Sequence, residues 1–217
     1  MTPVRVAVLA SGGGTNLQAL LDALASPAGA PARVVRVLAD RPAAGALERA
    51  RRAGVEAAAV PDPADADAVG AALDGADLVV LAGYLKLVPA PVVARFRWRM
   101  INIHPALLPA FGGPGMYGRR VHEAVIASGT ALTGVTVHYV DEQYDRGPII
   151  AQWPVPVRPA DTADALAARV LPVEHRLLPA VVLALARRGL PAEPIRLFAK
   201  TPAFGCLDHP SVELADA

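Results

Sequence analysis

The sequence predicts an α/β fold: a Rossmann-like, mostly parallel sheet with helices on both faces. Two observations predict it. Short runs rich in β-branched residues alternate with helical segments through the first hundred residues, and the connections between them are short. This alternation is typical of parallel strands joined by helices that cross over the sheet and bury both of its faces.

Five buried strands are expected in the first half, because each candidate is a short apolar run bounded by turn residues. In chain order they are 4–10, 33–39, 55–60, 77–83 and 100–104, of which 55–60 is the weakest. Helices are expected in the stretches between them, at 16–26, 44–54, 64–75 and 89–96. The second helix ends in a glycine, which favours the backbone conformation that closes a helix.

The second half of the chain has a different rhythm. A glycine- and proline-rich loop at 108–120 shows no periodicity and is long enough to suggest a function. A helix at 121–129 follows it. Two strands at 133–140 and 148–157 then enclose the polar turn 141–147, and this pattern predicts a β-hairpin.

The last predicted element is a long helix that Thr162 caps and that continues to residue 189. Pro172 and Pro179 are expected to break or kink it, because proline lacks the backbone N–H that a helix interior uses. Residues 191–217 contain prolines and glycines without periodicity and are expected to form an irregular tail. Residues 1–190 then form a single domain.

Composition limits the class of protein. A chain of 217 residues with 53% hydrophobic and 19% charged residues has enough apolar sequence for a sizeable core. A net charge of +1 argues against non-specific binding to nucleic acid or to a membrane surface. No apolar run approaches the ~20 residues of a membrane span, and the first run is too short for a signal peptide. The single cysteine, Cys206, permits no internal disulfide, so we expect a cytoplasmic protein.

The first candidate site is the stretch SGGGTN at 11–16, between the first strand and the first helix. Glycines let the backbone approach a ligand, and the free N–H groups of a helix N-terminus attract an anion such as phosphate. No Gly-Lys-Ser/Thr follows, and Leu17 stands where a dinucleotide fingerprint needs its third glycine. We interpret the stretch as a monophosphate site. The alternative is a tight turn in which Thr15 or Asn16 caps the helix.

Asn102 and His104 form the second candidate site, on alternate positions at the end of the fifth strand. Side chains two residues apart on a strand point to the same face, and ligands of parallel sheets bind beyond the carboxyl ends of the strands. We interpret the pair as facing a ligand. The alternative is a strand end that emerges into water and holds a structural histidine.

Acidic residues fill the turn of the predicted hairpin, at Asp141, Glu142 and Asp145. Such residues usually bond to their own backbone or to water. If Asp145 instead faces His104, its carboxylate orients the imidazole and raises the pKa, because a negative neighbour favours the charged form. His138 either borders the site or only packs beside it. The histidines show no metal-ligand spacing, so no metal is expected.

Five stretches of the sequence occur together: SGGGTNLQAL, LAGYLKLV, NIHPALLPAFGG, GVTVHYVDEQYDRGPIIAQ and VEHRLLP. In order and spacing, over about residues 4–190, they resemble the folate-dependent formyltransferase family. Asn-x-His-Pro with a later Asp-x-Gly-Pro is shared across that group, whereas the loop Ser-Gly-x-Gly-Thr/Ser-Asn singles out the members that formylate glycinamide ribonucleotide. The resemblance implies an enzyme of purine biosynthesis that takes 10-formyltetrahydrofolate as co-substrate, needs no metal, and is a monomer or homodimer.

The resemblance also implies roles for single residues. Asn102, His104 and Asp145 match the family's catalytic trio. The residues that match its ribonucleotide side are Gly14, Thr15, Asn16 and Glu174. Those that match its folate side are Leu85, Lys86, Leu87, Val88, Asn102, Asp141 and Asp145. The phosphate-binding half would then span about residues 1–100, and the folate and catalytic half about 101–190.

Three features depart from the family pattern. The stretch 62–75 contains no arginine and looks shortened, although some relatives have an arginine there that contacts folate. The loop 112–120 is longer than the simplest family form. Leu171 stands where a polar residue often assists phosphoribosyl binding.

The residue types of the trio fit acyl transfer. Attack of an amine on the formyl carbon places negative charge on the formyl oxygen. Hydrogen bonds from Asn102 and a protonated His104 to that oxygen are each worth about 3–4 kcal/mol. Asp145 would keep His104 charged and oriented, and no covalent enzyme intermediate is needed.

Other functions use parts of the same pattern. A formyltetrahydrofolate hydrolase directs the trio at water but generally carries a further N-terminal domain. A methionyl-tRNA formyltransferase usually adds an RNA-binding domain, for which the chain has neither the length nor the charge. A nicotinamide dehydrogenase would use Asp40 as its ribose acceptor, but the third glycine of its fingerprint is missing. No feature of the sequence favours a ligand-binding protein without activity, whereas the intact trio favours an enzyme.

Overall fold

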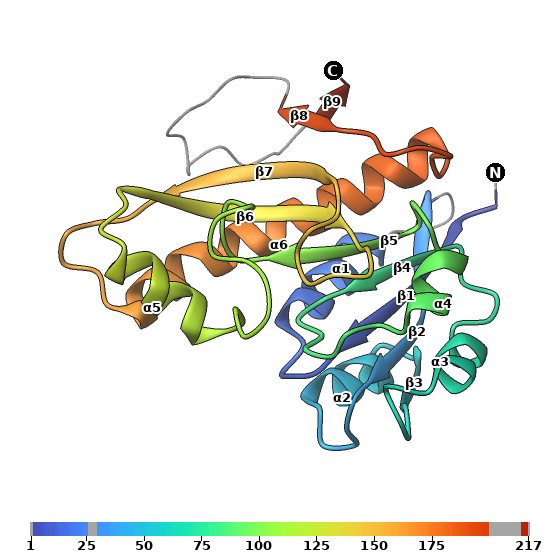
Figure 1. Cartoon of the computed structure of the whole chain (residues 1–217). Helices are drawn as coiled ribbons and strands as arrows, with labels where there is room; N and C mark the ends of the chain where they lie inside the picture. Colours follow the sequence, from blue (N-terminus) through green and yellow to red (C-terminus); the bar gives the residue numbers. More distant parts are fainter. Residues whose placement is uncertain (1, 26–29, 200–213, 217) are drawn as a thin grey trace.

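The computed structural model describes residues 2–25, 30–199 and 214–216; Cys206 lies outside the described residues. Its main element is a seven-stranded sheet of order β3-β2-β1-β4-β5-β6-β7 (Figure 1). The first five strands run parallel: β1 (Val4–Ala10), β2 (Ala32–Ala39), β3 (Glu56–Ala59), β4 (Leu78–Leu81) and β5 (Met100–His104). The hairpin strands β6 (Leu132–Tyr139) and β7 (Ile149–Pro156) extend the sheet in antiparallel pairing.

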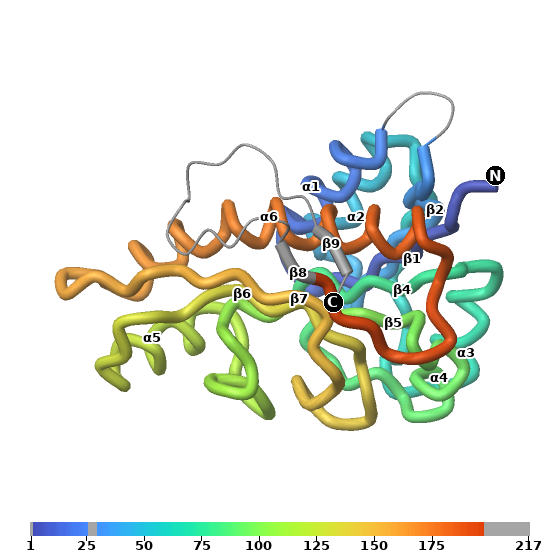
Figure 2. Tube along the Cα trace, turned by 90° about the horizontal axis from the view of Figure 1, so that it is seen from above, coloured from blue at the N-terminus to red at the C-terminus, as the bar shows by residue number. Residues whose placement is uncertain are grey.

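Helices cover both faces of the sheet (Figure 2). On one face lie α1 (Thr15–Leu24), α2 (Gly45–Arg52) and α6 (Ala163–Arg188), and on the other lie α3 (Ala66–Ala72) and α4 (Ala90–Arg95). A further helix, α5 (Arg119–Ala127), packs against α6. The predicted fold class is therefore confirmed.

The central strand β1 shows why its sequence is apolar without alternation. Val6 and Val8 belong to the hydrophobic cluster beneath α1 and α6, whereas Ala7 and Leu9 belong to the cluster beneath α3 and α4. Because the strand is covered on both faces, every position from Val6 onward is buried.

Two findings bear on the expectations for the C-terminal part: Pro172 and Pro179 do not break the predicted long helix, and the tail is not wholly irregular. α6 is one helix of 26 residues, with Pro172 and Pro179 inside it. An interior proline costs a helix about 3 kcal/mol, and burial of the apolar face of α6, Pro179 included, offsets that cost. The tail is also not wholly irregular, because β8 (Leu197–Ala199) pairs antiparallel with β9 (Leu214–Asp216).

Strand order decides where a ligand can bind. The chain passes from the β1-β2-β3 side of the sheet to the β4-β5 side, and such a reversal opens a crevice at the carboxyl ends of the central strands. β5 ends at this edge with Asn102 and His104, whereas Ile101 and Ile103 of the same strand face the core. Within the described ranges, no helix combines the length and the apolar character needed to cross a bilayer.

Candidate active site

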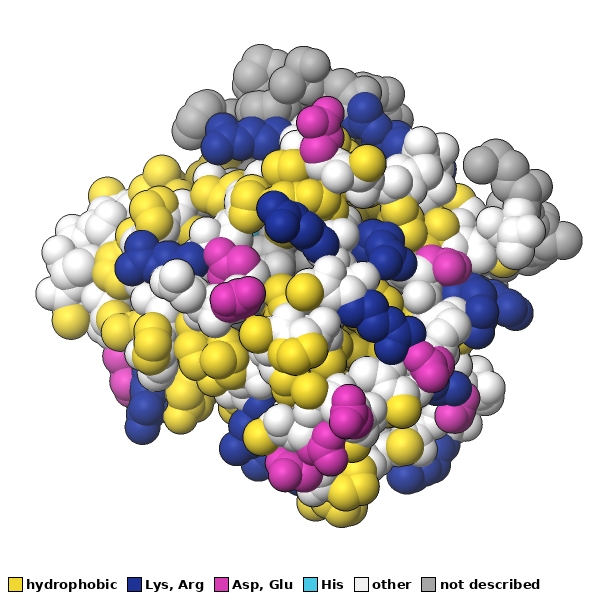
Figure 3. Space-filling view, turned by 45° about the vertical axis from the view of Figure 1, so that its right-hand side comes forward, with side chains coloured by type: hydrophobic (Ala, Val, Ile, Leu, Met, Phe, Trp, Pro, Cys, Tyr) yellow, Lys and Arg dark blue, Asp and Glu magenta, His cyan; other side chains and the backbone are white. Residues whose placement is uncertain are grey.

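A cavity of about 450 Å³ lies at the carboxyl ends of β4 and β5. Pockets for small-molecule ligands usually measure about 300–1,000 Å³. Ten of the twelve predicted site residues line it: Asn16, Leu85, Lys86, Leu87, Val88, Asn102, His104, Asp141, Asp145 and Glu174. Gly14 and Thr15 are not among its lining residues, and they directly precede Asn16 at the start of α1. Figure 3 shows one face of the molecule, on which Lys and Arg side chains are interspersed with Asp and Glu side chains, so this face carries charge of both signs.

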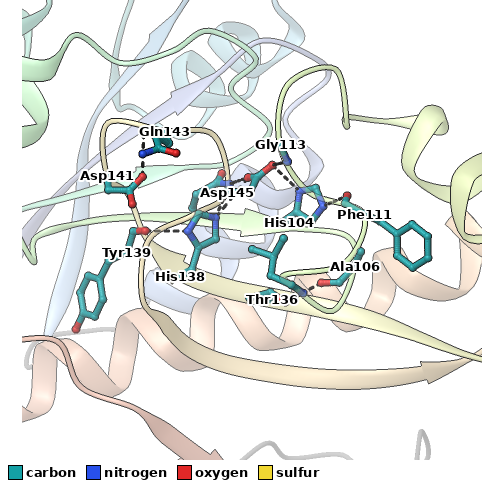
Figure 4. Close-up of polar contacts among 12 residues, drawn as sticks. His104, Ala106, Phe111, Gly113, Thr136, His138, Tyr139, Asp141, Gln143 and Asp145 are labelled. Carbon is teal, nitrogen blue, oxygen red and sulfur yellow. Dashed lines mark hydrogen bonds and ion pairs between the residues drawn. The ribbon is translucent and has the colours of Figure 1, made fainter.

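The predicted trio meets in this cavity, and Figure 4 shows Asp145 directed at His104. Asp145 lies in the turn of the hairpin, where its Oδ2 is 3.6 Å from Nδ1 of His104. The other carboxylate oxygen, Oδ1, accepts a hydrogen bond from Nδ2 of Asn102 at 3.3 Å. The backbone N–H of Gly113 donates to Oδ2 at 2.9 Å and so ties the glycine-rich loop to the hairpin turn. Asn102 and His104 thus converge on one anionic group, with Asn102 as its side-chain donor and Nδ1 of His104 facing it.

The loop after β5 fixes the tautomer of His104. Nε2 of His104 lies 2.8 Å from the carbonyl oxygen of Phe111. A carbonyl oxygen only accepts hydrogen bonds, so Nε2 carries a proton whether the ring is neutral or charged. The atom that gains or loses a proton is therefore Nδ1, which faces Asp145. On the neighbouring strand, Thr136 supports the same loop by donating from Oγ1 to the carbonyl of Ala106 (Figure 4).

The pKa of His104 corrects one expectation from the sequence. Burial lowers the pKa of this imidazole, which is 3% exposed. The Asp145 carboxylate and the Phe111 carbonyl raise it, as the sequence predicted for the carboxylate, but the net direction is downward. His104 in the free protein is therefore held in its neutral form more strongly than an ordinary histidine.

The Asp145 carboxylate is held in its charged form. Burial alone raises its pKa, but the contact with His138, the charge of His104 and the Gly113 N–H together bring the pKa below its ordinary value. Asp145 also has a φ of 57°, an uncommon value for a residue with a side chain. The turn therefore holds this side chain in place at a conformational cost.

His138 belongs to this cluster, so of the two interpretations the site-bordering one is confirmed. It lies opposite Asn102 in the pairing of β5 with β6. Its Nε2 is 3.1 Å from Nδ2 of Asn102 and 3.6 Å from Oδ1 of Asp145. Its Nδ1 lies 2.8 Å from the carbonyl oxygen of Tyr139.

The SGGGTN stretch forms the turn into α1. Gly14 has a φ of 75°, and a Cβ at this position would lie 2.7 Å from Cα of Ala46, so only glycine fits. Nδ2 of Asn16 donates to Oε2 of Glu174 on α6 at 2.5 Å. Oδ1 of Asn16 is buried without a partner in the described residues, and burial raises the pKa of Glu174. Leu171 lies one turn before Glu174 but does not line the cavity.

The segment 85–88 forms another wall of the cavity. Leu85 and Leu87 expose 37% and 45% of their surface, whereas Val88 is buried. The backbone N–H of Leu85 donates to Oγ of Ser11 at 2.9 Å, which connects this wall to the SGGGTN stretch. Asp141 accepts a hydrogen bond from the N–H of Gln143 and thereby stabilises its own turn.

Sequence reasoning assigned no site role to several residues that line the cavity, among them His122 on α5 and Tyr84. Burial and the nearby His104 lower the pKa of His122, and its Nδ1 is buried without a partner in the described part of the chain. Burial, with smaller contributions from Asp40 and Tyr144, raises the pKa of Tyr84 to about 12. Tyr84 lies within the stretch LAGYLKLV, but nothing in that stretch marked its side chain as a site residue, and His122 stands in no motif.

Two other kinds of chemistry find no support here. Among the described residues, no three His, Cys, Asp or Glu side chains are grouped to hold a metal ion. The Asp40 side chain is 5% exposed, lies 3.4 Å from Nε of Arg41 and does not line the cavity. A nicotinamide dehydrogenase would therefore lack its ribose acceptor.

Comparison with known proteins agrees with this geometry. A phosphoribosylglycinamide formyltransferase of Mycobacterium tuberculosis is 44% identical over 196 residues, which cover 87% of each chain. The chloroplastic phosphoribosylglycinamide formyltransferase of Vigna unguiculata is 44% identical over 190 residues, 83% of this chain; the match spans only 60% of that relative's length. A crystal structure of glycinamide ribonucleotide transformylase 1 from Symbiobacterium toebii superposes with a TM-score of 0.78 at 38% identity, covering 99% of this chain and 94% of that one.

The family model of formyl transferases matches residues 4–182. This range includes the seven-stranded sheet, the trio and most of α6. The chain belongs to the formyl transferase family.

Proposed function

We propose that this protein transfers the formyl group of 10-formyltetrahydrofolate to the amine of glycinamide ribonucleotide, a step of purine biosynthesis. The observation that carries the proposal is the convergence of Asn102 and His104 on the Asp145 carboxylate inside one cavity. The names of the relatives from Mycobacterium tuberculosis and Vigna unguiculata support this choice of substrates.

The trio acts on the formyl oxygen. The amine nitrogen attacks the formyl carbon, a carbon–nitrogen bond forms, and the carbonyl electron pair moves to the oxygen. Nδ2 of Asn102 and Nδ1–H of protonated His104 donate to that oxygen, each worth about 3–4 kcal/mol. When the carbonyl forms again, the bond to N10 of the folate breaks, N10 gains one proton and the amine nitrogen loses one.

The lowered pKa of His104 fits such a step. As negative charge develops on the formyl oxygen, a second anionic group approaches Nδ1 beside Asp145. Opposite charge nearby favours the imidazolium, so the pKa of His104 rises as the intermediate forms. Asp145 stabilises that charge and orients the ring.

The two substrates approach from different walls of the cavity. Asn16 and Glu174 hold the ribose, and the backbone at Gly14 and Thr15 with the N-terminus of α1 holds the phosphate. The pterin ring lies against the backbone of 85–88, with Asp141 on its other side. The phosphate half of the domain is then about 1–100, and the folate half about 101–190.

One chain supplies all these residues, so a monomer or a homodimer suffices for activity. The partners are the two small molecules, and the proposal involves no nucleic acid and no membrane.

An absorbance assay with 10-formyl-5,8-dideazafolate tests this function. Deformylation is expected only when glycinamide ribonucleotide is present, with one formylated ribonucleotide formed for each folate consumed. His104→Ala serves as the inactive control. Deformylation at the same rate without the ribonucleotide would instead identify the hydrolase.

A further inference from the structure

The hydrogen bonds around His138 carry an inference about which end of the Asn102 amide faces the reaction. The carbonyl oxygen of Tyr139, 2.8 Å from Nδ1 of His138, can only accept, so Nδ1 carries the ring proton. In the neutral ring Nε2 then holds a lone pair. That lone pair lies 3.1 Å from Nδ2 of Asn102 and accepts one of its hydrogens, whereas Oδ1 of Asp145, the charged group that also faces Nε2, is 3.6 Å away and beyond hydrogen-bond distance.

We propose that His138 is a positioning residue: as the neutral Nδ1–H tautomer, it holds the Asn102 amide with its N–H group toward the formyl oxygen. This inference rests on the proposed function. With one Nδ2 hydrogen donated to His138, the second is directed at Oδ1 of Asp145, at a longer 3.3 Å. The second hydrogen is the one available to the formyl oxygen when substrate enters.

Losing the lone pair reverses this arrangement. A protonated His138 would direct an N–H from Nε2 at the Nδ2 hydrogens of Asn102, only 3.1 Å away. The amide would then turn over and present its oxygen to His138, which moves the donor away from Asp145. An oxyanion would meet a carbonyl oxygen where it needs a donor, which is repulsive.

The strands are shaped to hold His138 in this orientation. Asn102 and His138 are directly paired across β5 and β6, which brings their side chains to the same face. The pairing of β6 with β7 shifts register between Val137 and His138, and such irregularities re-aim side chains beside functional sites. Gly147 packs directly on the Tyr139 carbonyl, where a Cβ would overlap its oxygen. A larger residue there would displace the acceptor that fixes the ring.

Three variants and one spectrum test the proposal. His138→Leu removes the acceptor, and His138→Gln keeps an amide oxygen that can accept from Asn102. Thr133→Val is the control on the same strand, because Thr133 is buried and its Oγ1 has no partner in the described residues. Steady-state kinetics with both substrates give kcat and KM for each variant. Nitrogen-15 NMR of the unmodified protein gives the tautomer of His138.

We expect His138→Leu to lower kcat by about 10²-fold, the effect of misplacing one oxyanion donor, with both KM values near those of the parent. His138→Gln should recover about tenfold of that loss, the worth of one hydrogen bond. Thr133→Val should match the parent. The spectrum should show a protonated Nδ1 and a lone pair on Nε2.

Equal losses in the Gln and Leu variants, or losses that appear in KM instead of kcat, would overturn the proposal. So would a spectrum with the proton on Nε2, which decides the matter even where His138→Leu fails to fold. The proposed function fails separately, by absence of formyl transfer in the parent protein, a result that leaves the tautomer measurement valid.

Discussion

Replacing Asp145 by asparagine removes one negative charge from the catalytic cluster and keeps the size of the side chain. The carboxylate is the larger of the two influences that raise the pKa of His104 against the effect of burial; the other is the Phe111 carbonyl. Without the carboxylate, the imidazolium loses its partner, so the pKa of His104 falls further below its ordinary value. A smaller fraction of His104 is then protonated at any given pH.

The geometry sets the size of this effect. Opposite unit charges 3.6 Å apart attract by about 1 kcal/mol in water and by about 4–5 kcal/mol at an effective dielectric constant near 20. The two side chains are 4% and 10% exposed, which favours the larger value. Since about 1.4 kcal/mol corresponds to a factor of ten, we expect Asp145→Asn to lower kcat by about 10³-fold.

The assay is a pH–rate profile of kcat for the parent and for Asp145→Asn, with the His104 imidazole titrated by NMR. Activity that needs protonated His104 is lost as pH rises through the histidine pKa. The alkaline limb that reports His104 should therefore lie at lower pH in the variant. Asp164→Asn makes the same change in charge at an exposed site, where the carboxylate pairs with Arg119, and should leave the profile unmoved. An unmoved His104 pKa in Asp145→Asn would refute the reasoning and leave Asp145 as a residue that only structures its loop.

Three further outcomes follow from the walls of the cavity. Burial raises the pKa of Glu174, so its contribution to stability is full at low pH and is lost as pH rises through the folded-state pKa. Glu174→Gln should then raise the Tm by about 2–4 °C at pH 8 and by nothing at acid pH, and equal shifts by calorimetry at both pH values would contradict this. Asn16→Ala should raise the KM for the ribonucleotide by about tenfold and leave the KM for the folate unchanged. Equal increases in both KM values would count against the assignment of Asn16 to the ribonucleotide. Ser11→Ala removes the acceptor of the Leu85 amide and should raise the KM for the folate about fivefold. Lys86→Ala leaves the backbone intact and should change that KM little. A larger increase in Lys86→Ala than in Ser11→Ala would show that the charge of the lysine matters more than the backbone.

Much of the fold could be predicted because the signal is local. The run 33–39 coincides almost fully with β2 (Ala32–Ala39), since its β-branched residues favour a strand and its apolar end at 37–39 is buried in the sheet. The hairpin followed from two β-rich runs around a polar turn. The sequence predicted a long helix at the place of α6, but whether Pro172 and Pro179 break it could not be predicted, because packing against the sheet decides whether a helix tolerates an interior proline.

The site was predictable in part. Alternation on a strand put Asn102 and His104 on one face, and strand order put that face at a ligand edge. Spacing alone could not bring Asp145 to His104; the family resemblance implied it, and the hairpin turn accomplishes it.

Two properties of the site depend on surroundings that no motif contains. Whether the pKa of His104 is raised or lowered depends on the balance between burial, which lowers it, and the Asp145 carboxylate, which raises it. The role of His138 depends on the register of β5 with β6 and on the carbonyl that fixes its ring.

The most direct test of the central claim, that His104 and Asp145 act as one unit, is a double-mutant cycle on the single-turnover rate of formyl transfer. His104→Ala and Asp145→Ala are each expected to slow this step by orders of magnitude while ribonucleotide binding is retained. The double variant should be little slower than the worse single variant, because either change already disables the pair. A double variant whose rate is lowered by the full product of the two single-variant factors would contradict the account.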